Sequence, residues 1–237
     1  MRRIILIGTA AVAVTAFATI AGAAERDTGG SYLEQREAAP SQAFELTAAI
    51  DYTQGLGQIQ KGSANNINDV ANAGAGFNLG VGYRVTPMLG IGVNAEYQEF
   101  ATGRTLDPGS SARGTAFDVN ASFHFNPYRR LDPWVKVATG YRLLWSVPSQ
   151  GTNVLIHGFD LAKVQAGLDI RSTPGVAIGP MIGADLNVFL WERPDGGSNT
   201  AISDPRVNTF LYAGIQGRFD AGGVEVHDPA LSVAKGF

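Results

Sequence analysis

The sequence predicts an eight-stranded antiparallel β-barrel of the up-and-down type. From Phe44 to Phe219, apolar side chains hold every second position in about eight stretches of roughly ten residues. The positions between them carry glycine, asparagine and charged residues. This alternation is typical of a strand with one face against an apolar phase and the other against a polar one. The connections alternate between long and short, which is the arrangement of consecutive antiparallel hairpins.

Strands and turns follow one another in a regular order. Proline marks the short turns at Thr86-Pro87-Met88, at 127–133 and at Ser172-Thr173-Pro174-Gly175, because its ring fixes φ near about −65° and it has no N–H for a ladder. The long polar loops are expected at about 53–74, 99–114, 146–158 and 192–206. The strands are expected at 44–52, 75–85, 89–98, 115–126, 134–145, 162–171, 176–190 and 207–219.

The N-terminal residues predict export. Met1-Arg2-Arg3 precedes an apolar run from Ile4 to Ile20, and Ala21-Gly22-Ala23 follows. A basic start, an apolar centre and small residues before the cut are typical of a signal peptide, here cleaved after Ala23. A membrane anchor is the alternative, but the run ends without a basic stop. No later stretch approaches the ~18 apolar residues of a membrane helix, so the strands indicate a barrel in the outer membrane of a Gram-negative bacterium.

These features divide the chain into four parts. They are a signal peptide (1–23), a periplasmic lead-in (24–43), the barrel (44–219) and a periplasmic tail (220–237). The short turns then face the periplasm and the long loops face outside. The lead-in is polar, and we expect it to be flexible, with a short plug or partner-binding segment as the alternative.

The composition excludes several classes of protein. The chain has no cysteine, and 16% of its residues are charged. A cysteine-linked lipid anchor, a disulfide framework and a thiolate metal site are therefore excluded. Loss of Arg2 and Arg3 with the signal peptide changes the formal net charge from −3 to −5. No basic field is left to attract nucleic acid.

Alternation alone does not say which face of the barrel is inside, because lipocalins are apolar within and polar outside. Here aromatic residues end the apolar face at both rims, as membrane interfaces require. Glycine crowds the polar face, which suits the narrow lumen of eight strands. We therefore expect the apolar face to contact outer-membrane lipid. The predicted aromatic girdle is Phe44, Tyr52, Tyr97, Phe125, Tyr141, Trp145 and Phe219.

The inward face is predicted to hold six acidic and six basic residues, so that the two sets balance. Because unpaired charges are costly in a poorly hydrated lumen, we expect ion pairs across the barrel. Such a network plugs the lumen and leaves no open pore; a gate, such as Arg84 with Glu96, is the alternative to structural pairing. The predicted network is Glu45, Asp51, Arg84, Glu96, Asp118, Lys136, Arg142, Lys163, Asp169, Arg171, Asp185 and Arg218.

Segments 78–96 and 125–141 resemble hairpins of the outer-membrane protein A and opacity-protein superfamily. The first reads Asn-Leu-Gly-Val-Gly-Tyr-Arg-Val-Thr-Pro-Met-Leu-Gly-Ile-Gly-Val-Asn-Ala-Glu, and the second ends in Val-Ala-Thr-Gly-Tyr. The resemblance covers about 44–219, and its motifs are generic to the class. It implies an eight-stranded barrel with roles in envelope integrity, adhesion or host contact. The peptidoglycan-binding domain of the best-known member is missing here, which puts cell-wall tethering in doubt.

The end of the last strand partly matches the signal that such families present to the barrel-assembly machinery. Tyr212, Gly214 and Phe219 fit this signal, whereas Gly217 stands where a hydrophobic residue is usual. The chain then continues to Phe237. We expect a periplasmic or partner-binding tail, so deletion of Asp220–Phe237 is predicted to leave insertion intact.

The sequence predicts no catalytic, cofactor-binding or metal site. Its three histidines show no metal-ligand spacing: His124 is expected inward, His157 at the tip of a loop and His227 in the tail. Outer-membrane lipid A deacylases use an outward histidine and serine two apart, but here Asn126 follows an inward His124. Palmitoyl-transferring barrels hold an acyl chain in an apolar lumen, and this lumen is charged. The chain is therefore not expected to be an enzyme or to need a cofactor.

Three functional hypotheses remain. The first is a structural or interaction barrel whose loops or tail contact protein partners, because loops carry recognition on rigid scaffolds. The second is an OmpW-like transporter of small hydrophobic molecules, which needs an apolar lumen segment near the outer rim. Its hints are Phe189 and Trp191, both expected inward, with Phe210 and Leu144 nearby. The third is a lipid-modifying enzyme.

Overall fold

The computed structural model describes residues 37–62, 66–103 and 108–226. The predicted signal peptide with its cleavage site after Ala23, residues 24–36 of the lead-in, and residues 227–237 of the tail with His227 lie outside the described residues.

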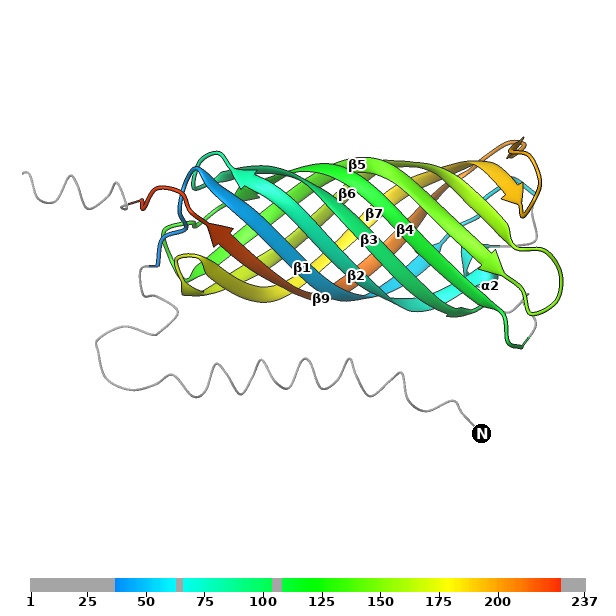
Figure 1. The fold of residues 1–237 in the computed structure, drawn as a ribbon, viewed down its shortest axis with the longest axis horizontal. Coiled ribbons are helices and arrows are strands. Elements are labelled where there is room, and N and C mark those ends of the chain that lie inside the picture. Colours follow the sequence, from blue (N-terminus) through cyan, green and yellow to red (C-terminus); the bar gives the residue numbers. More distant parts are fainter. Residues whose placement is uncertain (1–36, 63–65, 104–107, 227–237) are drawn as a thin grey trace, which may run out of the picture.

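Eight long strands close into an antiparallel barrel, which confirms the predicted fold class. Each strand pairs with the next along the chain, and pairing of the last strand with the first completes the ring. The strands run obliquely around the barrel axis (Figure 1). Because the ring has no free edge, backbone N–H and C=O groups can pair between strands throughout the wall. The strands are β1 (Ala43–Leu56), β2 (Ala71–Arg84), β3 (Leu89–Thr102), β4 (Ser111–His124), β5 (Leu131–Val147), β6 (Val154–Thr173), β7 (Val176–Pro194) and β9 (Val207–Ala221).

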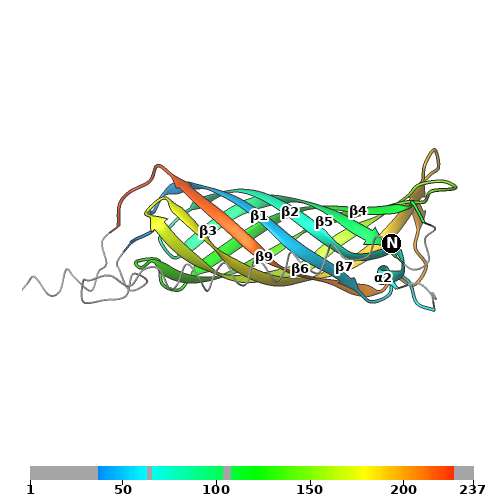
Figure 2. The same cartoon turned by 90° about the horizontal axis from the view of Figure 1, so that it is seen from below.

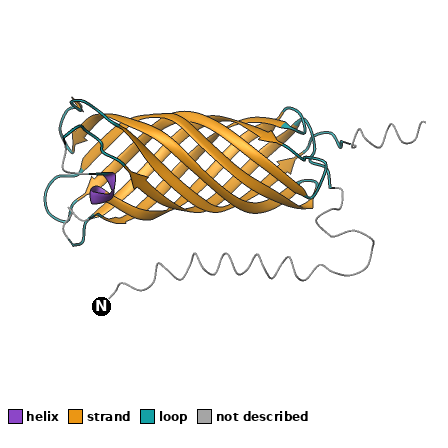
Figure 3. Ribbon diagram, turned by 180° about the vertical axis from the view of Figure 1, so that it is seen from behind, coloured by secondary structure: helices purple, strands orange, loops and turns teal. Residues whose placement is uncertain are grey.

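The two ends of the barrel differ in their connections. At one end, called the short-turn end, lie the tight turns β2–β3, β4–β5 and β6–β7, together with the start of β1 and the end of β9. The other end, called the long-loop end, carries the longer connections. One of these contains the one-turn helix α2 (Ile67–Val70), and another contains β8 (Thr200–Ala201), which pairs with β7. Figures 2 and 3 show α2 at the mouth of the barrel.

Most strands extend further toward the long-loop end than the alternation predicts. The largest difference is in β6, which begins at Val154 instead of about Ala162. The loop before it therefore spans only 148–153, and the expectation that His157 lies at a loop tip is wrong. The first residues of β6 pair as a strand although they do not alternate strictly, because the barrel wall continues beyond the part of its outer surface that is apolar.

The apolar face is on the outside, as predicted. Val93 and Val137 are 54% and 53% exposed, whereas Glu45 and Arg84 on the opposite parity are 8% and 0% exposed. Five girdle residues are exposed on this outer surface: Phe44, Tyr52, Tyr97, Phe125 and Phe219. The other two, Tyr141 and Trp145, share the outer parity of β5 and are half-buried. No helix among the described residues is long and apolar enough to cross a membrane.

Candidate functional site

The lumen is filled by side chains in four successive zones. From the short-turn end, they are an ionic layer, a polar chamber, a second ionic layer and an apolar cap. Two cavities of about 10 Å³ each lie in the chamber. A volume of this size holds about one water molecule. Side chains of both ionic layers and of the cap fill the lumen on either side of this chamber.

The ionic layer at the short-turn end joins three arginines to four carboxylates. Arg84 Nη2 lies 3.0 Å from Glu45 Oε2, and Arg218 Nε lies 2.7 Å from Asp169 Oδ2. Arg218 also contacts Glu45, so these pairs form one network across the barrel. Asp220 takes part in it through Arg171 Nη1 at 3.1 Å and Arg84 Nε at 3.5 Å. Arg171 Nη2 lies 3.8 Å from Asp132 Oδ2.

The only group of potential metal ligands among the described residues lies in this layer. It comprises His124, Asp132 and Asp169, whose ligand atoms lie within 4.8 Å of one another. His124 Nδ1 is 2.7 Å from Asp132 Oδ2, and Arg171 Nη2 lies 4.0 Å from Asp169 Oδ2. The Arg171 guanidinium thus stands beside both carboxylates and supplies the positive charge that a metal ion would bring. We therefore assign no metal to this group.

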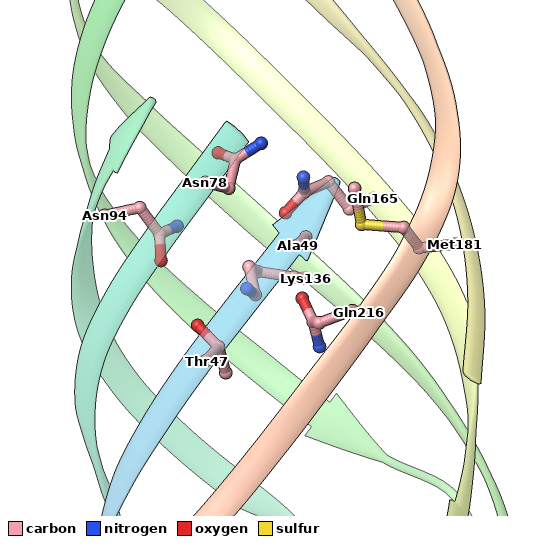
Figure 4. A pocket seen from close by; sticks show the side chains of 8 residues that line it. All are labelled: Thr47, Ala49, Asn78, Asn94, Lys136, Gln165, Met181 and Gln216. Carbon is pink, nitrogen blue, oxygen red and sulfur yellow. The ribbon is translucent and has the colours of Figure 1, made fainter. Parts of the chain in front are cut away.

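The polar chamber surrounds the buried side chain of Lys136. Figure 4 shows amide and hydroxyl groups from five strands pointing into the same space. Lys136 is 4% exposed and has no ion pair among the described residues; its ammonium lies 5.6 Å from the centre of the Trp134 ring. Gln165 Oε1 and Gln216 Nε2 are buried without a hydrogen-bond partner in the described structure. Water in the two cavities can serve these groups.

The second ionic layer is organised by Arg142. Its guanidinium donates to Asp185 Oδ2 at 2.6 Å and to Asp160 Oδ1 at 3.1 Å. Gln98 Oε1 and Asn187 Oδ1 accept further hydrogen bonds at 2.6 and 3.0 Å. Such planar, many-donor contact is the particular property of arginine. Arg142 is 1% exposed, so protein groups, and not solvent, stabilise its charge.

Lys163 completes this layer beside Arg142. Its ammonium lies 2.5 Å from Glu96 Oε2 and 3.4 Å from Asp118 Oδ2. It also lies 5.3 Å from the ring centre of Tyr212. Two buried lysines of the same lumen thus differ sharply, because Lys163 is paired with two carboxylates and Lys136 with none.

An apolar cap covers the second ionic layer at the long-loop end. Phe100, Leu144, Phe189 and Phe210 are between 0% and 4% exposed and converge from four strands. Two loops complete the cap with Ile67 from α2 and Ile202 from the β7–β9 connection. Gly55 makes room for Ile67, since a Cβ at that position would lie 2.3 Å from Ile67 Cγ2. Below the cap, the Arg142 guanidinium lies 4.4 Å from the centre of the Phe210 ring, at the distance of a cation–π contact.

The loops of the cap are also joined to each other at the surface. Gln60 pairs with Pro205, and the Arg206 N–H donates to the Ile59 carbonyl at 3.0 Å. Lys61 Nζ lies 3.7 Å from Asp204 Oδ2, but both side chains are more than half exposed, so this ion pair adds little. The buried apolar contacts of the cap therefore contribute most of the free energy that holds the loops closed.

Of the twelve charges predicted in the lumen, ten take part in ion pairs. The exceptions are Asp51 and Lys136. Asp51 accepts a hydrogen bond from Asn78 Nδ2 at 2.9 Å, while its Oδ1 has no partner among the described residues. The specific pair Arg84–Glu96 is not formed: Arg84 contacts Glu45 and Asp220, and Glu96 contacts Lys163 and Arg142.

The expected balance of charge is wrong, because the strands bring three further carboxylates inside. Asp132, Asp160 and Asp220 are buried and paired, which makes nine acidic residues against six basic ones in the described lumen. Asp132 and Asp220 were assigned to a turn and to the tail, but they lie within β5 and β9. Asp160 lies in β6 between the predicted loop (146–158) and the predicted strand (162–171), beyond a bulge between Asp160 and Ala162 that interrupts the alternation.

A second bulge moves Trp191 to the outer surface. Pairing between β6 and β7 shifts at His157/Gly158, so Phe189 points inward at 0% exposure while Trp191 stacks on the His157 ring, 5.5 Å away. The expectation that both side chains point inward is wrong for Trp191. The Tyr141 hydroxyl lies 2.5 Å from His157 Nδ1, so these rings form one aromatic cluster on the outer wall.

Comparisons with known proteins agree on the fold. No family model matches the chain, and no curated protein matches it. Among solved structures it is similar to Neisserial surface protein A, with a TM-score of 0.51 at 12% identity over 74% of this chain and 96% of that one. Weaker likenesses include OprG from Pseudomonas aeruginosa (TM-score 0.47, 10% identity, 78% and 99% covered) and AlkL (0.49, 10%, 86% and 100%).

The likeness to Neisserial surface protein A defines a class by its architecture. The chain has the fold of the small eight-stranded outer-membrane β-barrels, which confirms the predicted resemblance at the level of the fold. The exposed apolar side chains of the outer surface are those that a barrel wall presents to lipid. The likeness does not assign a particular activity to this chain.

Proposed function

We propose that the chain is a structural or interaction barrel of the outer membrane, with its short-turn end in the periplasm and its loops outside. The observation that carries this proposal is the filled lumen, in which two ionic layers and an apolar cap enclose a polar chamber with two cavities of about 10 Å³ each. A barrel with a filled lumen can act on other molecules only through its outer surface. The loops are the part of this surface whose sequence can vary without disrupting the pairing of the strands. The outer-membrane lipid and the barrel-assembly machinery are the partners that its insertion requires.

The same geometry supports the proposal that the chain is not an enzyme. His124 is 0% exposed and engaged with Asp132, so no substrate reaches it. His157 is engaged with Tyr141 and Trp191 on the outer wall. Cofactors and nucleic acid are likewise not expected.

Conductance tests the filled lumen. We expect no long-lived channels from pure protein in planar bilayers, because the ionic layers and the cap block ion flow. Channels of nanosiemens scale would contradict the proposal. A variant with Arg142, Phe210, Arg84 and Arg218 all changed to glycine, which removes side chains from both ionic layers and from the cap, serves as the control for an opened lumen.

Crosslinking in cells tests the interaction role. The chain has no cysteine, so single cysteines at Ser149 and Ser198, both exposed in loops, report on contacts at the long-loop end. Val119→Cys, on the lipid-facing wall, is the control. We expect defined protein adducts at the loop positions and none at the control. Absence of adducts at every loop position would argue for a barrel that acts alone.

A second function, transport of small hydrophobic molecules as in OmpW-like barrels, is favoured by one specific observation. The apolar cap places a cluster of buried hydrophobic side chains inside the mouth, as such a site requires. Its loops would have to withdraw Ile67 and Ile202 before a ligand could enter. Uptake of a small apolar molecule into vesicles separates the two functions: Ala112→Trp, which fills the cap, should abolish uptake, and Ala48→Trp on the lipid-facing wall should not. Equal uptake with both variants and with empty vesicles would remove this candidate.

A further inference from the structure

Residues 37–42, called the strap below, lie against the short-turn end of the barrel. Sequence reasoning placed them in a flexible lead-in, but Ala39 is 0% exposed and Pro40 is also buried. The strap leads directly into β1 at Ala43. This part of the lead-in is therefore packed against the barrel.

One end of the strap is fixed where the barrel closes. Ser41 and Val224 exchange two backbone hydrogen bonds of 3.0 and 2.8 Å, which extend the pairing of β1 with β9 by an isolated bridge. Gly223 has a φ of +87°, and a Cβ there would lie 2.5 Å from the Ser41 carbonyl oxygen. A glycine is thus required for the close approach of the segment before β1 to the segment after β9.

The other end of the strap is fixed on the opposite side of the mouth. The Ala39 N–H donates to the Pro127 carbonyl at 2.7 Å, and Glu37 Oε2 lies 3.2 Å from Arg130 Nη2. Pro127 and Arg130 belong to the β4–β5 turn. Counted around the ring in either direction, this turn is four strands away from the β1–β9 junction. The strap therefore crosses the mouth from one side to the other.

Arg130 connects the strap to a third segment. Its Nη1 donates to the carbonyl oxygens of Arg171 and Ser172 at 3.0 and 3.3 Å, both at the end of β6 beside the β6–β7 turn. The Arg130 side chain is 12% exposed and that of Glu37 is 20% exposed, so the contact is partly shielded from water. Through this one side chain the strap is tied to two of the three short turns.

We propose that the strap is a latch that closes the short-turn mouth and is held shut by the Glu37–Arg130 contact. Release of the latch opens the first ionic layer to water and leaves the apolar cap closed, because the two closures share no described residue. The inference goes beyond the proposed scaffold role and does not depend on it.

Cysteine reactivity tests the latch. Ala177 and Ala112 are both buried inward-facing alanines, at 2% and 0% exposure, near the short-turn and long-loop ends respectively. Each is changed to cysteine in the full chain, and its rate of reaction with a small water-soluble thiol reagent is measured on folded barrel. The latch is weakened in three variants. Two of them, Glu37→Gln and Arg130→Gln, remove the ion pair, and the third, deletion of residues 24–41, removes most of the strap.

Latch removal should raise the reaction rate at Ala177→Cys at least tenfold and leave that at Ala112→Cys unchanged. Glu37→Gln keeps every barrel residue, so the test stands even where the deletion fails to fold. An unchanged rate at Ala177→Cys in Glu37→Gln and Arg130→Gln overturns the proposal. Equal acceleration at both positions also overturns it, because the whole barrel would then have loosened.

Discussion

The two ends of this lumen are closed by different kinds of contact. At the long-loop end, loops bring Ile67 and Ile202 onto aromatic side chains of the wall. At the short-turn end, the wall itself supplies arginines and carboxylates, with the strap outside them. Apolar contacts are non-directional and tolerate loop movement, whereas buried ion pairs need fixed geometry. Rigid strand ends can therefore hold a charged closure, while loops close better with hydrophobic side chains.

The largest effect is expected when the buried charge directly below the apolar cap is removed. In Arg142→Met, the carboxylates of Asp185, Asp160 and Glu96 lose their shared partner while remaining buried. We expect the free energy of unfolding to fall by about 3–5 kcal/mol. Reversible denaturant unfolding in lipid vesicles measures it. Arg113→Met is the control, because that exposed ion pair should contribute about 0.5 kcal/mol or less.

The charged closure is broken most directly from the C-terminal side. Deletion of 220–237 was expected to leave insertion intact, but Asp220 is a buried partner of Arg84 and Arg171. Insertion stays a prediction, but we expect the free energy of unfolding to fall by about 2–4 kcal/mol, since two buried guanidinium groups lose a carboxylate. Deletion of 227–237, which keeps Asp220, is the matched control. If both deletions unfold at the same denaturant concentration, Asp220 does not support the charged closure.

The strands, their faces and most lumen charges follow from alternation, because a barrel in lipid forces each side chain in or out. Alternation fails where a bulge adds a residue, and this explains why Asp160 was missed and Trp191 was placed inward. It also stops at strand ends, where Asp132 and Asp220 pair. The cap and the strap depend on contacts between distant segments, such as Ile67 with Phe210 and Glu37 with Arg130. No local pattern reports such contacts.

The apolar closure can be loosened without touching any charge. Ile67→Ala removes a fully buried side chain from the cap and should reduce the free energy of unfolding by about 2–3 kcal/mol. The loops should loosen first, so trypsin should cut after Lys61 faster than in the parent protein. The short-turn end should stay closed, so the reaction rate of the cysteine in Ala177→Cys should be the same with and without Ile67→Ala. Acceleration there as well would mean that the two closures are coupled.

The smallest effect is expected midway between the two closures, and it has the opposite sign. Lys136 is buried without a carboxylate partner in the described lumen, so its charge is costly where it stands. Lys136→Met keeps the length of the side chain and removes the charge, and we expect it to be neutral or stabilising by about 1 kcal/mol. Lys163→Met is the matched control, because it strands Glu96 and Asp118 and should be clearly destabilising. A large decrease in the free energy of unfolding of Lys136→Met would contradict this. It would show that the Lys136 ammonium stabilises the excess carboxylates of both ionic layers across the chamber.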